Sequence, residues 1–316
     1  MGRSQALINR MRIHLYANCW NELRILPYFM RHYEPFVDEF IILDDCSKDG
    51  SVEFLNAQTK VRLIKANRKQ GSYIEQSTKF FNEAWKESRS KADWIITCNV
   101  DEHVYHKNIV AYLQLCLQNN VTILSAQGYE MVSLEFPSSQ GRLCDEVRLG
   151  AQTQCLHGPS SLLNKIMVFN PQAIQEVQFD MGRHTANPIG EVVYPYSVEL
   201  KLLHYKFLGL DYAKQRYREL KSGLSSTDKK HGMGSQYMWD TGKIKQNYES
   251  ILVIAEVVVT NGIISDARLN LSVLPQKIKL RLVELVKQHH RHPIVRLFLS
   301  LLNSVRSALS STHFKR

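Results

Sequence analysis

Short, strongly apolar runs alternate with amphipathic stretches between residues 12 and 128 of the chain. The apolar runs are rich in Ile, Val and aromatic residues, and they predict buried strands at residues 12–17, 39–43, 61–65, 94–98 and 121–126. The stretches between them carry apolar residues at helical spacing and predict helices at residues 23–32, 52–56, 73–88 and 109–118. Strands and helices that alternate in this way predict an α/β fold with a mostly parallel sheet flanked by helices.

The second half of the chain has a different pattern. From residue 128 to residue 196, Gly and Pro residues divide the sequence into loops and short elements. Beyond about residue 240 the spacing becomes helical, and Pro293 divides the tail into two amphipathic pieces. We therefore predict a main α/β domain at residues 1–240 and a helical C-terminal extension at residues 241–316.

The net charge of +10 is concentrated in residues 277–316. This segment holds nine Lys or Arg against one acid, Glu284, so it carries +8 and the rest of the chain +2. A basic tail with an apolar face predicts peripheral contact with an anionic membrane or with a partner surface, or equally packing on the main domain. The tail lacks interleaved aromatic residues, so nucleic acid is not an expected partner.

No stretch approaches the run of about 20 apolar residues that crosses a bilayer, and no secretory leader is recognisable at the N-terminus. The six cysteines lie far apart, without metal-ligand spacing, as is typical of reduced thiols. These features predict a cytoplasmic protein, peripheral at the inner face of the membrane if the tail binds there.

Polar residues follow three of the predicted strands, at the edge where parallel α/β sheets bind ligands. Asn21 and Glu22 come after the first strand, and the acidic turn that begins with Asp44 and Asp45 comes after the second. Carboxylates at the second position can accept hydrogen bonds from a base or a ribose hydroxyl. Other polar residues of this turn, Ser47 and Asp49, have a simpler explanation as caps of the following helix.

The fourth predicted strand ends in the sequence Asn99-Val100-Asp101-Glu102-His103. Carboxylates are the hard oxygen ligands that hold Mn²⁺ or Mg²⁺, and such an ion neutralises a diphosphate as it leaves. Asp101 is the first candidate ligand, and Glu102 either ligates the ion in its place or only shapes the turn. The alternative is a solvated strand-end turn, where acidic residues are common.

In this order, the motifs resemble family-2-like GT-A glycosyltransferases, in particular a bacterial branch of that family. The first motif runs from Asn21-Glu22 through Leu26-Pro27 to His32-Tyr33, and the D-D-x-S-x-D-G-S turn follows at residues 44–51. The resemblance continues at residues 165–171, 182–188 and 202–206, and it covers roughly residues 10–240. One position departs from the family, because Asn99 stands where the usual D-x-D-E motif has its first acid.

The resemblance implies transfer of a sugar from a nucleotide-diphosphate sugar donor to a glycan, polysaccharide or lipid-linked acceptor. It implies that Asp44 and Asp45 contact the nucleoside and that Asp101 holds the metal. It also implies that His204 contacts the metal or the diphosphate, although a lone histidine in the apolar run Leu200–Leu208 is also explained as a structural residue. The further candidates for donor binding are Asn21, Glu22, Asn99, through a ribose hydrogen bond, and Lys165, through a phosphate.

An inverting transferase also needs a carboxylate that takes the proton of the acceptor hydroxyl. Glu130 and Glu191 are the first candidates, Asp145 and Glu146 are further ones, and retaining chemistry stays open.

Two other classes of function compete with a glycosyltransferase. A non-catalytic protein that binds a nucleotide or glycan on the same fold is compatible with Asn99, which brings no charge to a metal. A sugar nucleotidyltransferase is disfavoured, because it would normally place a glycine-rich phosphate loop after the first strand, where this chain has no glycine.

Overall fold

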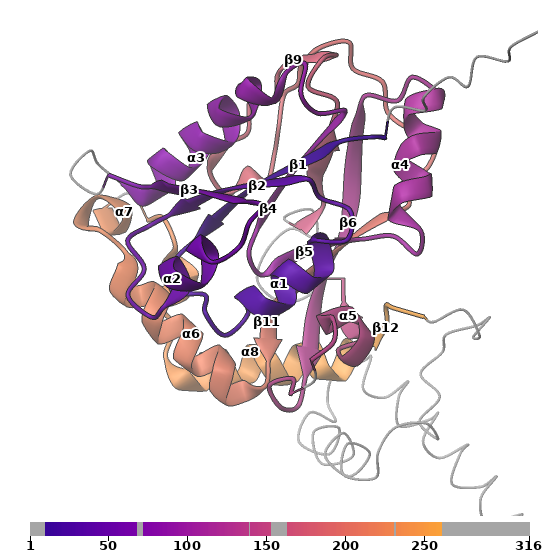
Figure 1. Cartoon of the computed structure of the whole chain (residues 1–316). Helices are drawn as coiled ribbons and strands as arrows, with labels where there is room; N and C mark the ends of the chain where they lie inside the picture. Colours follow the sequence, from indigo (N-terminus) through magenta and orange to yellow (C-terminus); the bar gives the residue numbers. More distant parts are fainter. Residues whose placement is uncertain (1–9, 68–71, 139, 153–162, 231, 261–316) are drawn as a thin grey trace, which may run out of the picture.

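The computed structural model describes residues 10–67, 72–138, 140–152, 163–230 and 232–260, and Figure 1 shows how their elements are arranged. The centre is a mixed sheet in the order β12-β7-β6-β8-β4-β1-β2-β3, with β11 pairing with β6 and β5. The predicted α/β class and the mostly parallel sheet flanked by helices are confirmed.

The first half of the chain alternates strands and helices much as the apolar pattern predicts. The strands are β1 (Ile13–Cys19), β2 (Glu39–Asp44), β3 (Val61–Lys65), β4 (Trp94–Asn99) and β5 (Glu102–Tyr105). The helices are α1 (Leu26–Tyr33), α2 (Ser51–Asn56), α3 (Tyr73–Glu83), the 3₁₀ helix η2 (Ala84–Ser88) and α4 (Ile109–Gln118). The stretch predicted as one helix at residues 73–88 therefore divides into α3 and η2.

The second half contributes strands of both directions. They are β6 (Ile123–Ser133), β7 (Leu149–Ala151), β8 (Lys165–Phe169), β9 (Ile174–Glu176), β10 (Ile189–Gly190), β11 (Leu200–Leu208) and β12 (Glu256–Val257). The helices are α5 (Leu143–Glu146), η4 (Met181–Arg183), α6 (Leu210–Gly223), α7 (Ser226–Lys230), η5 (Ser235–Met238) and α8 (Thr241–Ile254). Strand β8 runs antiparallel between β4 and β6, whereas β11 runs parallel to β6, so the sheet is mixed.

Both faces of the sheet are buried, which explains why its strands are apolar at nearly every position. Successive side chains of a strand point to opposite faces. Leu15 of β1 accordingly lies in the core under α1 and α4, whereas Tyr16 lies in the core under α3 and η2, where Trp85 is fully buried. Pro27 occupies the first turn of α1, where a missing N–H costs nothing.

The parallel strands end at one edge of the sheet. Cys19 at the end of β1 pairs in register with Asp44 of β2, and Asn18 pairs with Asn99 of β4. The loops that follow β1, β2 and β4 therefore start side by side, which brings the three predicted motifs to one place.

Helix α6 packs against β11, and α8 packs against β6 and β7. Phe207 of β11, Tyr217 of α6 and Tyr248 of α8 share a core there, and the Tyr248 hydroxyl donates to the carbonyl of Ser133 at 2.8 Å. Asp240 caps α8 by accepting from the Lys243 N–H at 2.8 Å. The domain division after residue 240 stays a prediction, and the basic tail at residues 277–316 lies outside the described residues.

Two further predictions concern the cysteines and the membrane. Cys19, Cys98, Cys116 and Cys144 are buried free thiols and Cys46 is exposed, while Cys155 lies outside the described residues. Among the helices that the structure describes, none has the length and apolar character needed to span a bilayer.

Candidate functional site

The loops after β1 and β2 hold each other through reciprocal hydrogen bonds. Asn21, at a left-handed φ of +50°, accepts from the Lys48 N–H with its side chain and donates its own N–H to Ser47 Oγ, both at 2.8 Å. The Glu22 N–H donates to Ser51 Oγ at 3.0 Å. Asn21 and Glu22 thus fix the position of the acidic turn, and the amide of Asn21 can accept from the next loop without a charge.

Asp44 and Asp45 lie where the sequence places them, at the carboxyl end of β2, and both are buried. The Asp44 carboxylate accepts from the Ser47 N–H at 3.1 Å, which closes a tight turn. The Asp45 N–H donates to the Cys19 carbonyl at 2.9 Å and extends the pairing of β1 with β2 by one residue.

Asp101, His204 and Glu130 form a row in which the imidazole lies between two carboxylates. His204 Nε2 is 3.3 Å from Asp101 Oδ2, and His204 Nδ1 is 3.0 Å from Glu130 Oε2. Register pairing places His204 of β11 beside Glu130 of β6, and the Tyr205 N–H holds the turn by donating to the Asp101 carbonyl at 2.8 Å. Three separate segments therefore build this row.

The electrostatics of the row favour an imidazolium. Burial lowers the pKa of His204, but Glu130 and then Asp101 raise it, and the result lies well above the usual value. Burial likewise raises the pKa of Asp101, but His204 outweighs it and lowers that pKa. His204 Nδ1 and Glu130 Oε2 are close but not aligned as a hydrogen bond, and neither atom has another hydrogen-bond partner among the described residues.

Glu102 lies beside this row but is occupied by two buried cations. Its Oε1 accepts from Lys165 Nζ at 2.7 Å, and its Oε2 accepts from Arg183 Nη2 at 2.5 Å. Oε2 also accepts from the Asn99 N–H at 2.9 Å, while Asn99 Oδ1 accepts from Arg183 at 3.1 Å. Burial raises the pKa of Glu102, but Lys165 and Arg183 outweigh it and hold that pKa well below its usual range.

This network bears on three predicted residues. Both oxygens of Glu102 have partners, and Lys165 is neutralised by Glu102 rather than free to meet a phosphate. Asn99 Oδ1 accepts a hydrogen bond from Arg183. The predicted roles of Glu102 in metal binding and of Lys165 and Asn99 in donor binding stay predictions.

Arg216 of α6 clamps the loop after β1. Its guanidinium donates to the carbonyls of Trp20 and Asn21, both at 3.1 Å, and pairs with the Glu22 carboxylate. Sequence reasoning missed Arg216 because its partners lie 194 to 196 residues away and no local pattern links them. It also gave no role to Arg183, although that residue stands inside the motif at residues 182–188.

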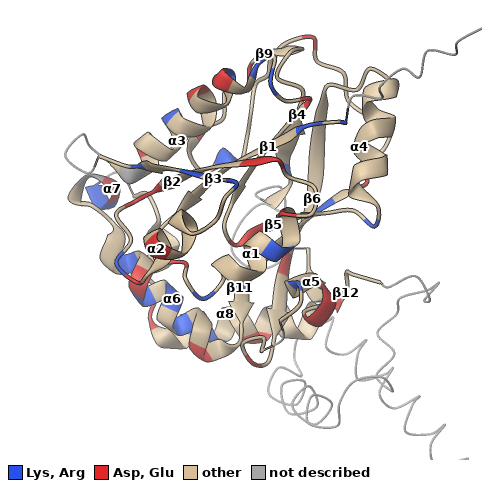
Figure 2. Cartoon of the chain, in the orientation of Figure 1, with Lys and Arg blue, Asp and Glu red and all other residues tan. Residues whose placement is uncertain are grey.

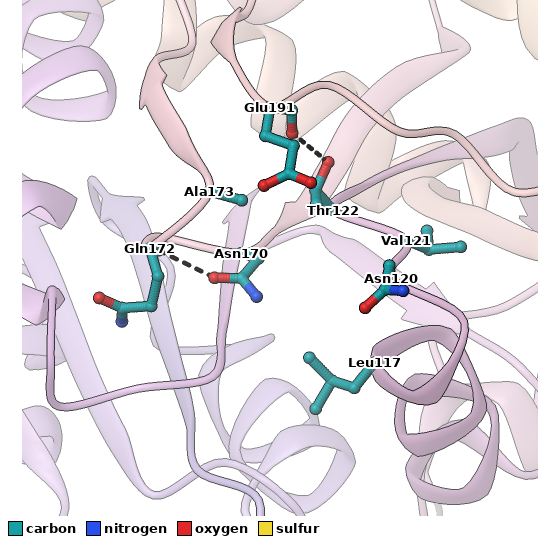
Figure 3. A pocket seen from close by; sticks show the side chains of 8 residues that line it. All are labelled: Leu117, Asn120, Val121, Thr122, Asn170, Gln172, Ala173 and Glu191. Carbon is teal, nitrogen blue, oxygen red and sulfur yellow. Dashed lines mark hydrogen bonds between the residues drawn. The ribbon is translucent and has the colours of Figure 1, made fainter.

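Glu191 lies at the opposite edge of the sheet from Glu130. It lines a pocket of about 250 Å³, shown in Figure 3, together with Leu117, Asn120, Val121, Thr122, Asn170, Gln172 and Ala173. Thr122 precedes β6 and donates to the Glu191 carbonyl at 2.6 Å. Thr122 and Glu130 are eight positions apart along the chain, roughly 26 Å at 3.3 Å per residue, so the structure does not bring Glu191 together with Asp101 and His204.

The other two candidate bases have local partners in or near α5. Asp145 pairs with Arg142 at 3.0 Å, and Glu146 accepts from the Ser138 N–H at 3.2 Å. Glu130 is therefore the predicted base that directly contacts His204.

The chain's own residues supply few ligands for a metal. In the part of the chain that the structure describes, no group of three or more His, Cys, Asp or Glu side chains is arranged to hold an ion. Asp101 and His204 offer one oxygen and one nitrogen, 3.3 Å apart, so a bound ion would need further ligands from a substrate.

Comparison with known proteins gives no family. No family model matches the chain, and no curated protein matches it. Among solved structures, S. aureus TarS residues 1–349 aligns with a TM-score of 0.34 at 10% identity, over 77% of this chain and 71% of that chain.

The 4-diphosphocytidyl-2C-methyl-D-erythritol synthase from Anaerococcus prevotii aligns with a TM-score of 0.28 at 8% identity, over 52% of this chain and 73% of that chain. A longer S. aureus TarS structure aligns with a TM-score of 0.31 at 12% identity, over 77% of this chain and 43% of that chain. All three TM-scores are below 0.5, so these likenesses carry no functional conclusion.

Proposed function

We propose that this chain is a glycosyltransferase that uses a nucleotide-diphosphate sugar donor and a divalent metal ion. The observation that carries the proposal is the row of Asp101, His204 and Glu130 at the edge of the sheet where the loops after β1, β2 and β4 meet. That edge is where open α/β sheets bind their ligands. The acceptor in this proposal is a saccharide or a lipid-linked saccharide.

The donor nucleoside would lie against the turn after β2. Asp44 and Asp45 begin that turn. Asn21 fixes it through two hydrogen bonds, one from its own N–H to Ser47 Oγ and one from the Lys48 N–H to its side chain. A turn held in this way needs little reordering when a ligand binds, which lowers the entropic cost of binding.

Asp101 and His204 fit a Mn²⁺ or Mg²⁺ ion that is completed by substrate. Manganese accepts both oxygen and nitrogen ligands, and magnesium is often bound through one or two carboxylates together with substrate phosphates. The bound ion would neutralise the charge that develops on the departing diphosphate. Asp101 supplies the carboxylate, and His204 must give up its Nε2 proton before that nitrogen can bind.

Glu130 would orient His204 rather than take the acceptor proton. A metal-bound histidine usually donates its second ring N–H to a carboxylate, which fixes the tautomer and the orientation of the ring. Glu130 Oε2 lies 3.0 Å from His204 Nδ1 and has no hydrogen-bond partner among the described residues, so a rotation of the ring or of the carboxylate would let it accept that N–H.

The proposal is tested by incubating the chain with a panel of nucleotide-diphosphate sugars, with and without Mn²⁺, and measuring release of the nucleoside diphosphate. We expect release that depends on Mn²⁺ in the parent and that falls at least 100-fold in Asp101→Asn, since a lost metal ligand removes charge stabilisation of the leaving group. Asp211→Asn, on the exposed face of α6, is the matched control and should behave as the parent. Equal, metal-independent release in the parent and in Asp101→Asn would remove the metal site from the mechanism.

A further inference from the structure

An extra residue in β11 follows His204. His204 pairs with Glu130 of β6, and Phe207 pairs with Val132, so two residues of β11 stand opposite the single residue Met131. Such a bulge redirects the side chains around it and is over-represented next to active sites. Here Tyr205 points into the core under α1, and Phe207 lies with Val132 in the core under α6 and α8. Lys206 lies between Tyr205 and Phe207 in the bulge, and its side chain belongs to neither core.

The Lys206 ammonium lies near the row of Asp101, His204 and Glu130. It is 4.8 Å from the ring centre of Tyr217 and 5.0 Å from that of Tyr237, and its charge interacts with those of Glu130 and Asp101. Cation–π contacts of this kind hold an ammonium group in place without neutralising it. Within the part of the chain that the structure describes, no carboxylate lies within 4.0 Å of it.

Three other cations around this edge, Lys165, Arg183 and Arg216, have carboxylate partners. Lys165 and Arg183 share Glu102, and Arg216 holds Glu22. Arg183 and Arg216 also lie over aromatic rings, at 4.3 Å from Phe81 and 6.0 Å from Trp20. Lys206 differs from these three cations in that no carboxylate of the described residues lies within ion-pair distance of it.

We propose that Lys206 binds the diphosphate of the donor, from the side of that group opposite to Asp101 and His204. This rests on the proposed function, and it assigns to Lys206 the phosphate contact predicted for Lys165. Together with the metal ion, an ammonium at this position would stabilise the negative charge that develops on the diphosphate as the sugar–phosphate bond breaks. It would also favour nucleoside diphosphates over nucleosides in the ground state.

The test measures the affinity of inorganic diphosphate, uridine, UDP and GDP by calorimetry in the presence of Mn²⁺. Lys206→Met keeps the apolar stem that packs between Tyr217 and Tyr237 and removes only the charge. We expect this variant to bind inorganic diphosphate and the preferred nucleoside diphosphate at least tenfold more weakly, with nucleoside affinity unchanged. Lys206→Arg should retain most of the affinity, because it keeps a cation over the same rings.

Lys243→Met is the matched control, since Lys243 lies 4.7 Å from the Trp239 ring in the same aromatic cluster. It should bind both diphosphates as the parent does. Parent-like binding by Lys206→Met, or an equal loss in Lys243→Met, overturns the role of Lys206 and leaves the metal proposal standing if Asp101→Asn still loses Mn²⁺-dependent binding. A parent chain that binds none of these diphosphates with Mn²⁺ overturns both proposals.

Discussion

Removing the charge of Glu102 should destabilise the fold rather than only weaken the binding of a metal. In Glu102→Gln the cations of Lys165 and Arg183 lose their shared carboxylate. The side chains of Glu102, Lys165 and Arg183 are 1%, 4% and 2% exposed, so water does not screen the charges that remain. Removing the charge of one partner of a buried ion pair lowers the free energy of unfolding by about 3–5 kcal/mol, because the other charge stays buried without a partner.

The assay is urea denaturation of the parent and the variant, followed by a thermal melt. In a chain of this size, a loss of that magnitude lowers the melting temperature by about 10 °C. Glu83→Gln is the matched control, because Glu83 pairs with Lys86 on the surface and its side chain is 55% exposed. Such a surface pair is worth less than about 1 kcal/mol, so the control should melt close to the parent.

A second substitution strengthens the test. Arg183 already donates to Asn99 Oδ1 at 3.1 Å, so Asn99→Asp in the Glu102→Gln background offers the cation a new carboxylate. We expect this double variant to recover part of the lost stability. The reasoning is refuted if Glu102→Gln unfolds at the same urea concentration as the parent, and loss of Mn²⁺-dependent donor binding without any loss of stability would make Glu102 a metal ligand instead.

Two further predictions concern Glu130 and His32. Glu130→Gln should weaken Mn²⁺ binding by about 10- to 100-fold if Glu130 orients His204, whereas unchanged Mn²⁺ affinity with a slower transfer step would make it the catalytic base. Burial lowers the pKa of His32 to about 4, below the value of 6.5 expected for the unfolded chain, so the stability that neutral His32 provides is present above pH 6.5 and is lost as the pH falls towards 4. Between about pH 7 and pH 5 the parent should lose about 2 kcal/mol more than His32→Leu in urea denaturation, and equal losses would contradict this.

The apolar pattern was sufficient to predict the parallel half of the sheet, because those strands are buried on both faces and therefore read as continuous apolar runs. Strand β11 occupies the apolar run Leu200–Leu208. The sequence gives this run as a reason for a structural role of His204, but it was not among the predicted strands. Strands β5, β7 and β8 were not predicted as strands, since they are short and lie among turns. The sheet is mixed because β8 enters antiparallel between β4 and β6, and this depends on contacts between segments far apart in the sequence.

The residues of the candidate site also divide into those that the sequence predicts and those that it does not. Asp44, Asp45 and Asp101 follow strands directly, so their common edge follows from the parallel topology. Pairings made across the chain leave no local pattern, as with Arg216 and Glu22 or with Arg183 and Glu102. Lys206 comes two residues after His204 in the sequence, but the bulge that contains it depends on the register between β11 and β6.

The clamp by Arg216 has a consequence for folding during synthesis. The loop at residues 20–22 leaves the ribosome early, whereas the guanidinium that holds its carbonyls belongs to a helix almost 200 residues later. Contacts across so long a stretch cannot form until both ends exist and the intervening chain has been closed into a loop. We therefore expect a nascent chain that ends before α6 to form its first strands while the loop at residues 20–22 is still unclamped. The site that we propose for the donor would then be completed only late in synthesis.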